Sequence, residues 1–305
     1  MTKFICETKN LSKKYKDFYA LKNVNLTIPK GEIYGLVGEN GAGKTTLIRI
    51  VCGLQKPTLG KYTIYGVSNE NKKIIKSRKR LGAIIETPSI CLDMTAEENI
   101  KEQYKLLGLP NYEGIEELLK LVELDKTGKK TAKHFSLGMR QRLGIAIALA
   151  GNPDILILDE PINGLDPEGI IEIRELIIKL NKERGITFLI SSHYLDELAK
   201  IATCYGIIDK GKMIREISSS ELENSFKKKV QINVNDIKEC VKYLEEEKIA
   251  YKVISDEIID IYERINVSDL VIALSKKNCI VNSFKEKDET LENYFLNLVG
   301  GADNV

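Results

Sequence analysis

The chain has 305 residues, enough for two domains that each have their own hydrophobic core. The composition, 43% hydrophobic and 30% charged, is ordinary for a soluble globular protein, and a net charge of +2 argues against a dedicated nucleic-acid binder. The longest apolar runs, such as IAIALA (145–150) and ILIL (155–158), are far shorter than the ~20 residues of a membrane-spanning helix, so we expect no crossing of the bilayer.

The cysteines predict a reducing compartment. They form no C-x-x-C pair and have no metal-type spacing, and the first ten residues carry no signal-peptide pattern. We therefore expect free thiols in the cytosol at Cys6, Cys52, Cys91, Cys204, Cys240 and Cys279.

Short apolar runs in the first two thirds of the chain predict buried strands. Helical patterns lie between most of them, which is typical of a parallel α/β sheet. The predicted strands are EIYGLV (32–37), LGAII (81–85), DILILD (154–159), ITFLIS (186–191) and YGIID (205–209). Three helical segments interrupt this pattern and predict an all-helical subdomain at about 88–150.

The pattern changes after DKGK (209–212), which reads as a hairpin turn. From about residue 228 we expect strand, helix, two strands, helix, strand and a last helix, the ferredoxin-like order. The predicted domains are therefore 1–220 and an accessory α+β domain at 221–305.

GENGAGKT (38–45) fits the phosphate-loop pattern G-x-x-x-x-G-K-[ST] between a predicted strand and a predicted helix. The glycines allow successive N–H groups to converge on phosphate oxygens at a helix N-terminus. Lys44 supplies a positive charge to the β- and γ-phosphates, and the Thr45 hydroxyl can ligate Mg²⁺. The alternative is a glycine turn with an incidental lysine, which the strand–loop–helix context disfavours. The predicted nucleotide-binding residues of this loop are Gly38, Glu39, Asn40, Gly41, Ala42, Gly43, Lys44, Thr45 and Thr46.

DILILDEP (154–161) delivers Asp159 and Glu160 at the carboxyl end of an apolar strand. Two adjacent acids there are costly unless a cation meets them. Beside a phosphate loop the cation is Mg²⁺, with Asp159 on the metal or its water shell and Glu160 polarising the attacking water. The alternative is a strand that simply ends in charged residues.

Asp166 and His193 are two further polar residues beside the predicted strands. NGLDP (163–167) predicts a turn in which Asp166 caps a helix and Pro167 takes its first position. SSH (191–193) ends another apolar strand, so His193 is either a partner of the γ-phosphate or attacking water, or an ordinary capping residue.

Taken together, these motifs resemble the nucleotide-binding subunit of an ABC transporter. GENGAGKT, FSLGMRQR, ILILDEP, NGLDP and SSH stand in that family's order over about residues 1–220. The resemblance implies a phosphate-loop NTPase cassette with a mixed sheet core. Tyr15 matches the aromatic residue that stacks on adenine, and LENYFLNLVGG (291–301) resembles the C-terminal extension of ABC-2 export ATPases.

The resemblance also implies the cofactors and partners. Two cassettes sandwich two ATP molecules with Mg²⁺, so the chain needs a second copy of itself. Each ATP is held by the phosphate loop of one copy and by the signature of the other, here FSLGM (135–139), in which Ser136 caps a helix and Gly138 remains. Asp166 of NGLDP is carried over as a further nucleotide-site residue. Separate membrane permeases would hold the chain at the cytoplasmic face.

The signature departs from the common LSGGQ. Leu137 replaces a glycine and restricts backbone approach, and Met139 removes an amide. We expect a working but altered site; the alternative is a degenerate one that binds ATP without driving hydrolysis.

Glu86, in LGAIIETPSI (81–90), falls where the family usually has a glutamine. A carboxylate there can ligate Mg²⁺ and act at the reaction site, but it adds negative charge near the phosphates. Together with FSLGM it resembles the exporters of bacitracin and lantibiotic-type peptides; the alternative is a loop that has drifted without functional meaning. The loop around Glu86 and TAEEN (95–99) are expected to dock on the permease.

The expected function is therefore the ATP-hydrolysing subunit of an exporter that confers resistance to antimicrobial peptides. Another ABC-2 substrate (a drug, a lipid or a polysaccharide) or an ATP-gated regulatory module with little hydrolysis stays open. A soluble ABC ATPase of translation or DNA repair would need tandem cassettes or a long coiled coil, and the chain has neither.

Overall fold

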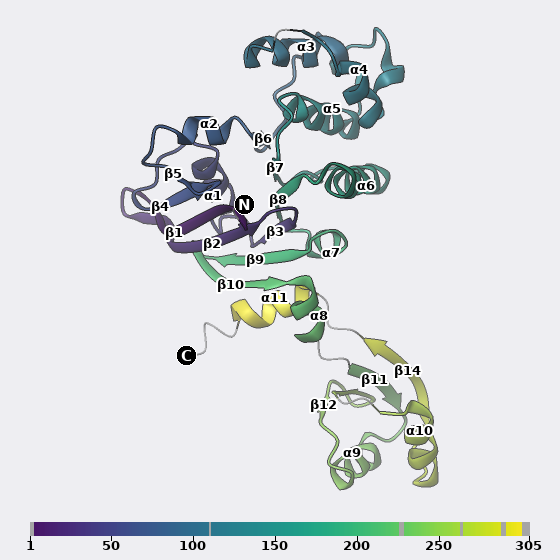
Figure 1. Cartoon of the computed structure of the whole chain (residues 1–305). Coiled ribbons are helices and arrows are strands. Elements are labelled where there is room, and N and C mark those ends of the chain that lie inside the picture. The colour runs from purple at the N-terminus through teal and green to yellow at the C-terminus, as the bar shows by residue number, and fades with distance from the viewer. Residues whose placement is uncertain (1–2, 110, 226–228, 263–264, 288–290, 301–305) are drawn as a thin grey trace. The chain divides into compact units, whose positions relative to one another are not determined.

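The computed structural model describes residues 3–109, 111–225, 229–262, 265–287 and 291–300. The chain divides into two compact units, residues 1–219 and residues 220–305 (Figure 1). None of the helices in the described ranges is both long and apolar enough to span a membrane.

A four-stranded antiparallel sheet begins the first unit. Its strands, in the order β2-β1-β4-β5, are β2 (Phe18–Pro29), β1 (Phe4–Tyr15), β4 (Leu59–Ile64) and β5 (Val67–Ser68). This sheet was not predicted from the sequence. Its strands mix buried and exposed positions and therefore carry no continuous apolar run.

A six-stranded mixed sheet follows the order β10-β9-β3-β8-β7-β6. The five strands from β6 to β9 in this order pair in parallel, and β10 closes an antiparallel hairpin on β9 across the predicted turn at 209–212. The strands are β10 (Lys212–Ser218), β9 (Cys204–Asp209), β3 (Ile33–Val37), β8 (Thr187–Ser192), β7 (Ile155–Asp159) and β6 (Leu81–Ile84). The predicted parallel core is confirmed, and the carboxyl ends of β3, β7 and β8 meet at one edge of the sheet.

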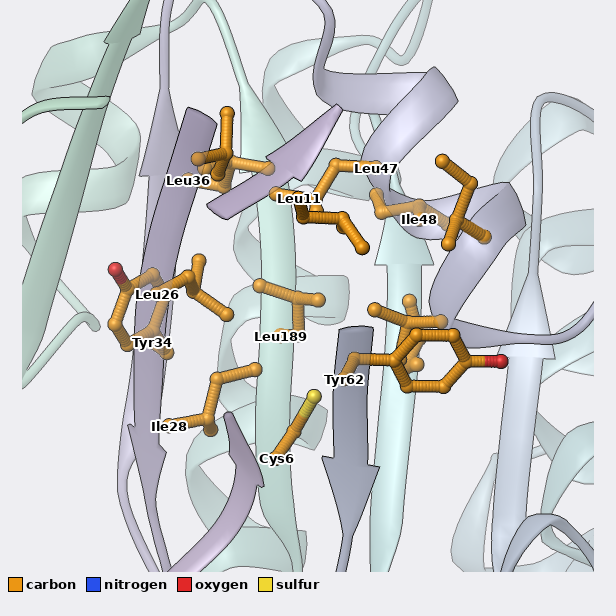
Figure 2. Packing of buried hydrophobic residues seen from close by; sticks show 14 of the residues in the cluster. Cys6, Leu11, Leu26, Ile28, Tyr34, Leu36, Leu47, Ile48, Tyr62 and Leu189 are labelled. Carbon is orange, nitrogen blue, oxygen red and sulfur yellow. The ribbon is translucent and has the colours of Figure 1, made fainter. Parts of the chain in front are cut away.

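Helix α1 (Lys44–Val51) packs its apolar side into the core shared by both sheets. Figure 2 shows Leu47 and Ile48 of α1 among Leu11, Leu36 and Leu189 from the strands. All five side chains are fully buried. Burial of each contributes roughly 1.5–3 kcal/mol, so the packing of α1 fixes the loop that precedes it.

The predicted helical subdomain is present. Helices α3 (Ala96–Leu107), α4 (Ile115–Leu121) and α5 (Leu137–Leu149) contact one another (Figure 1), and α5 also contacts β6. The other helical elements of this unit are α2 (Ile74–Arg78), the 3₁₀ turns at Asp125–Thr127 and Ala132–His134, α6 (Pro167–Arg184) and α7 (Leu195–Ala199).

The second unit has the predicted ferredoxin-like order. Its sheet runs β12-β13-β11-β14, with every neighbouring pair antiparallel. Residues of α9 and α10 complete its separate apolar core. The elements are α8 (Ser219–Ser225), β11 (Lys229–Val234), α9 (Ile237–Glu246), β12 (Tyr251–Val253), β13 (Ile258–Ile261), α10 (Val267–Lys276), β14 (Val281–Lys287) and α11 (Leu291–Gly300).

Candidate nucleotide site

The loop between β3 and α1 needs its glycines. Gly41 and Gly43 have φ angles of 85° and 108°, in the left-handed region that other residues rarely adopt. A Cβ at Gly43 would also lie 2.6 Å from the Ala20 carbonyl oxygen, and one at Gly38 would lie 2.4 Å from that of Ile208. The loop backbone therefore turns sharply at Gly41 and Gly43 and packs closely against the carbonyl oxygens of Ala20 and Ile208.

Lys44 is buried, with only 5% of its surface exposed. Its ammonium donates to the carbonyl oxygens of Gly38, at 2.6 Å, and Glu39, at 3.2 Å. The same nitrogen lies 3.2 Å from Oε1 of Glu160. A buried cation held by oxygen atoms at the mouth of a helix N-terminus is a suitable partner for phosphate.

A cavity of about 310 Å³ opens above this loop. It is lined by Tyr15, Phe18, Ala20, Glu39, Asn40, Gly41, Gly43, Lys44, Thr45, Thr46 and Glu160. Seven of the nine predicted loop residues thus line one space together with Glu160. Ala42 is instead buried in the core, and its carbonyl oxygen accepts from the N–H of Gly211.

Tyr15 and Phe18 form the aromatic wall of this cavity, at the tip of the β1–β2 hairpin, where they pair across the strands. The Tyr15 hydroxyl donates to Oε1 of Gln55 at 2.5 Å, while 43% of Tyr15 and 63% of Phe18 stay exposed. Phe18 was not predicted from the sequence as a site residue. The signal available was a second aromatic residue three positions after Tyr15, on a hairpin that had not been predicted.

Asp159 ends β7 and is 1% exposed. Its Oδ1 accepts a hydrogen bond from the Ser191 hydroxyl at 2.5 Å, whereas Oδ2 is buried and has no partner among the described residues. A buried carboxylate oxygen without a partner suits a cation. Together with the Thr45 hydroxyl on the cavity wall, this donor set fits Mg²⁺.

The described residues contain no group of three or more His, Cys, Asp or Glu that could hold a metal unaided. Mg²⁺ typically binds through one or two protein oxygens and the phosphates of its nucleotide. Asp159 and Thr45 fit that pattern, in which nucleotide and metal bind together.

Glu160 has a left-handed backbone, with φ of 51°. Its N–H donates to both the carbonyl and the hydroxyl oxygen of Ser191. Its Oε2 lies 2.8 Å from Nδ1 of His193 and accepts, at 3.4 Å, from the His193 backbone N–H. The carboxylate is therefore held between Lys44 and His193 and aimed into the cavity.

Glu86, predicted as a third carboxylate at the metal, forms an ion pair with Arg49 in this structure. Its Oε1 lies 2.7 Å from a guanidinium nitrogen of Arg49 on α1, and 62% of its side chain is exposed. It does not belong to the described lining of the cavity.

Ser136, Gly138 and Asp166 also lie outside the lining of the cavity in their own chain. Ser136 caps α5 by accepting from the Met139 N–H, and Asp166 caps α6 by accepting from the Gly169 N–H, with Pro167 at the first helical position. The predicted caps are confirmed. A Cβ at Gly138 would meet nothing closer than 3.8 Å.

Comparison with known proteins identifies the family. A family model for the ABC transporter matches residues 21–163. The bacitracin transport ATP-binding protein BcrA of Enterococcus faecalis is 39% identical over 98% of this chain and 97% of its own length. The chain belongs to the ABC transporter family. The lantibiotic transport ATP-binding protein SrtF of Streptococcus pyogenes is 44% identical over 70% of this chain and 91% of its own.

An ATP-binding cassette solved as a dimer in a post-hydrolysis state, bound to ADP and Pi, has the same fold. It is 30% identical, covers 70% of this chain and 98% of its own, and has a TM-score of 0.63. The predicted ABC cassette fold and ABC-type ATPase are thereby confirmed. The region that matches the family model, residues 21–163, includes the phosphate loop and Glu160.

Proposed function

We propose that the chain is the ATP-hydrolysing subunit of a bacterial exporter that removes an antimicrobial peptide of the bacitracin or lantibiotic type. The observation that carries this proposal is the 39% identity to BcrA across nearly the whole of both chains. That match spans the ferredoxin-like unit as well as the cassette, whereas the match to SrtF covers 70% of this chain. A shared accessory unit supports a shared kind of transporter.

The cavity supplies the parts that ATP hydrolysis needs. The phosphate loop and Lys44 bind and orient the phosphates, while Tyr15 and Phe18 offer aromatic faces to adenine. Bound Mg²⁺, held by Asp159 and Thr45, would supply positive charge to the β- and γ-phosphate oxygens. Glu160 accepts a proton from the attacking water, and His193 holds the carboxylate in position for it.

A second copy of the chain completes each site. Ser136 and Gly138 lie at the N-terminus of α5, whose first N–H groups favour an anion, yet they do not line the cavity of their own chain. In a symmetric dimer they would contact the γ-phosphate bound by the partner copy. This arrangement explains why one set of motifs per chain is sufficient.

A groove of about 490 Å³ is the proposed docking surface for a permease. Ile85, Thr87 and Pro88 line it from the loop around Glu86, and Leu107 and Gly144 line it from the helical subdomain. Fewer side chains of TAEEN are available to contact a permease than predicted, because Thr95 and Glu98 form a capping box and Asn99 is buried. Contact with a membrane subunit would hold the ATPase at the cytoplasmic face.

Resistance measurements test the proposed substrate. A susceptible bacterium would express the chain together with its membrane permease subunits, and the minimum inhibitory concentrations of bacitracin and of a lantibiotic would be measured. We expect a rise for at least one peptide that disappears in Glu160→Gln, with no change for an unrelated antibiotic. No rise for either peptide, with the complex assembled and hydrolysing ATP, would overturn the peptide assignment.

A further inference from the structure

The ion pair between Arg49 and Glu86 joins helix α1, which follows the phosphate loop, to the loop after β6. Arg49 lies on α1, five positions after Lys44 of the phosphate loop. Glu86 lies two residues beyond β6, in a backbone conformation with φ of 64° that few side chains adopt. One guanidinium nitrogen lies 2.7 Å from Oε1 of the carboxylate.

The loop that carries Glu86 reaches the same sheet edge as the catalytic acids. Ile84 pairs in parallel with Leu158, the residue before Asp159. Glu86 follows Ile84 by two residues, as Glu160 follows Leu158, so both acids come shortly after the carboxyl ends of neighbouring parallel strands. Three carboxylates thus approach one edge, and the phosphates of ATP would add four more negative charges.

Arg49 also supports neighbouring structure at the end of α1. Its carbonyl oxygen accepts from the N–H groups of Leu54, at 2.9 Å, and Gln55, at 3.2 Å. Leu54 lines the proposed docking groove, and Gln55 accepts the hydroxyl of Tyr15. The helix that begins in the phosphate loop therefore ends beside both the groove and the aromatic wall.

We propose that Arg49 is the positioning residue for Glu86 and neutralises it. By pairing with the carboxylate, the guanidinium holds the acidic loop beside the cavity without its charge opposing the binding of ATP. The inference rests on the proposed ATP site, and it deepens that site by explaining how the cassette tolerates glutamate at position 86. Among the described residues, Arg49 is the ion-pair partner of Glu86.

The rival explanation is an ordinary surface ion pair without functional effect. The two side chains are 36% and 62% exposed, so the attraction is screened by water and salt. The pair formed by Arg184 and Glu117 has a similar geometry, with a separation of 2.6 Å and exposures of 32% and 73%. Arg184 joins α6 to α4, and neither residue lines the cavity, so Arg184→Gln is a matched control.

The test compares the binding of a fluorescent ATP analogue by the full chain with and without Mg²⁺ at low ionic strength. The variants are Arg49→Gln, Arg49→Lys, Glu86→Gln, the double variant with glutamine at both positions, and Arg184→Gln. Without Mg²⁺, Arg49→Gln should weaken binding about two- to fivefold, because Glu86 then repels the phosphates. The double variant and Arg49→Lys should bind within twofold of the wild type, and the loss should shrink with Mg²⁺ or with about 1 M salt.

Three outcomes would overturn the inference. Binding by Arg49→Gln that equals binding by Arg184→Gln means that the charge of Glu86 does not reach the phosphates. A loss that persists in the double variant means that Arg49 acts on α1 rather than through Glu86. If neither the wild-type chain nor Arg184→Gln binds ATP, the proposed function itself is wrong. This result differs from the other two, in which both of these chains still bind ATP.

Discussion

The ammonium of Lys44 lies 3.2 Å from Oε1 of Glu160, so the phosphate loop and the residue after β7 share one cavity. The other oxygen of that carboxylate lies 2.8 Å from Nδ1 of His193. The cation, the acid and the imidazole follow the carboxyl ends of three parallel strands, β3, β7 and β8, of the mixed sheet. This convergence is what makes the edge suitable for phosphoryl chemistry.

Replacing Ser191 should destabilise the protein around the buried carboxylate of Asp159. Ser191→Ala removes the hydroxyl that donates to Asp159, and both residues are buried. A buried carboxylate that loses its donor costs about 1–3 kcal/mol, which should appear as a lower urea midpoint. Ser89→Ala, at an exposed position, is the control, and an equal midpoint for the two variants would contradict the prediction.

Gly138→Ala should separate dimer formation from folding. A Cβ at Gly138 has room in its own chain, so the thermal midpoint should stay the same or rise slightly. ATP-dependent dimerisation should weaken, because in the proposed dimer the added methyl group would face the phosphates bound by the partner copy. Gly43→Ala is the contrasting variant, since its Cβ would clash with the Ala20 carbonyl and destabilise the loop directly. If Gly138→Ala dimerises at the same ATP concentration as the wild type, the result would argue against the shared site.

Phe18→Ala should weaken ATP binding although no sequence motif includes Phe18. Loss of a stacking partner costs roughly 1–3 kcal/mol per base, which corresponds to about a 5- to 150-fold rise in Kd. Tyr15→Ala should behave similarly, whereas Tyr15→Phe keeps the ring and loses only the hydrogen bond to Gln55. Isothermal titration measures all three. Unchanged affinity in Phe18→Ala would mean that the base contacts Tyr15 alone.

Cys91 should report on docking of the permease. It is exposed on the segment that leads from the groove to α3, whereas Cys6, Cys240 and Cys279 are buried. Burial raises the pKa of the Cys6, Cys52 and Cys204 thiols to about 12, so all three stay protonated and slow to react at pH 7.5. Maleimide should therefore label one thiol rapidly, and Cys91→Ser should abolish this fast reaction. Assembly with the membrane subunits should slow the labelling of Cys91 severalfold. An equal labelling rate in the complex would mean that the permease docks on another surface.

The sequence was sufficient for features that depend on local pattern. The apolar runs of β3, β7 and β8 identify strands buried at every position, and the phosphate loop is defined by glycines that its backbone requires. The caps at Ser136 and Asp166 follow from residue type alone. In the second unit, alternating strands and helices predict the ferredoxin-like order.

The sequence was insufficient where distant residues decide the outcome. β1 and β2 mix polar and apolar positions, so their pairing, and with it the place of Phe18, depends on contacts across the chain. The ion pair of Glu86 with Arg49 joins residues 37 positions apart, and no local pattern reveals it. The partner-facing roles of Ser136 and Gly138 depend on a second copy and stay predictions.

Steady ATPase activity of the complex assembled with its membrane subunits is the most direct test of hydrolysis at Glu160. Glu160→Gln keeps the shape of the side chain and removes the base, so turnover should fall by about 10²- to 10⁴-fold while ATP still binds. Glu168→Gln, at an exposed position in the first turn of α6, should hydrolyse at the wild-type rate. Turnover by Glu160→Gln that matches the wild type would contradict the assignment of Glu160 and with it the proposed chemistry of the cavity.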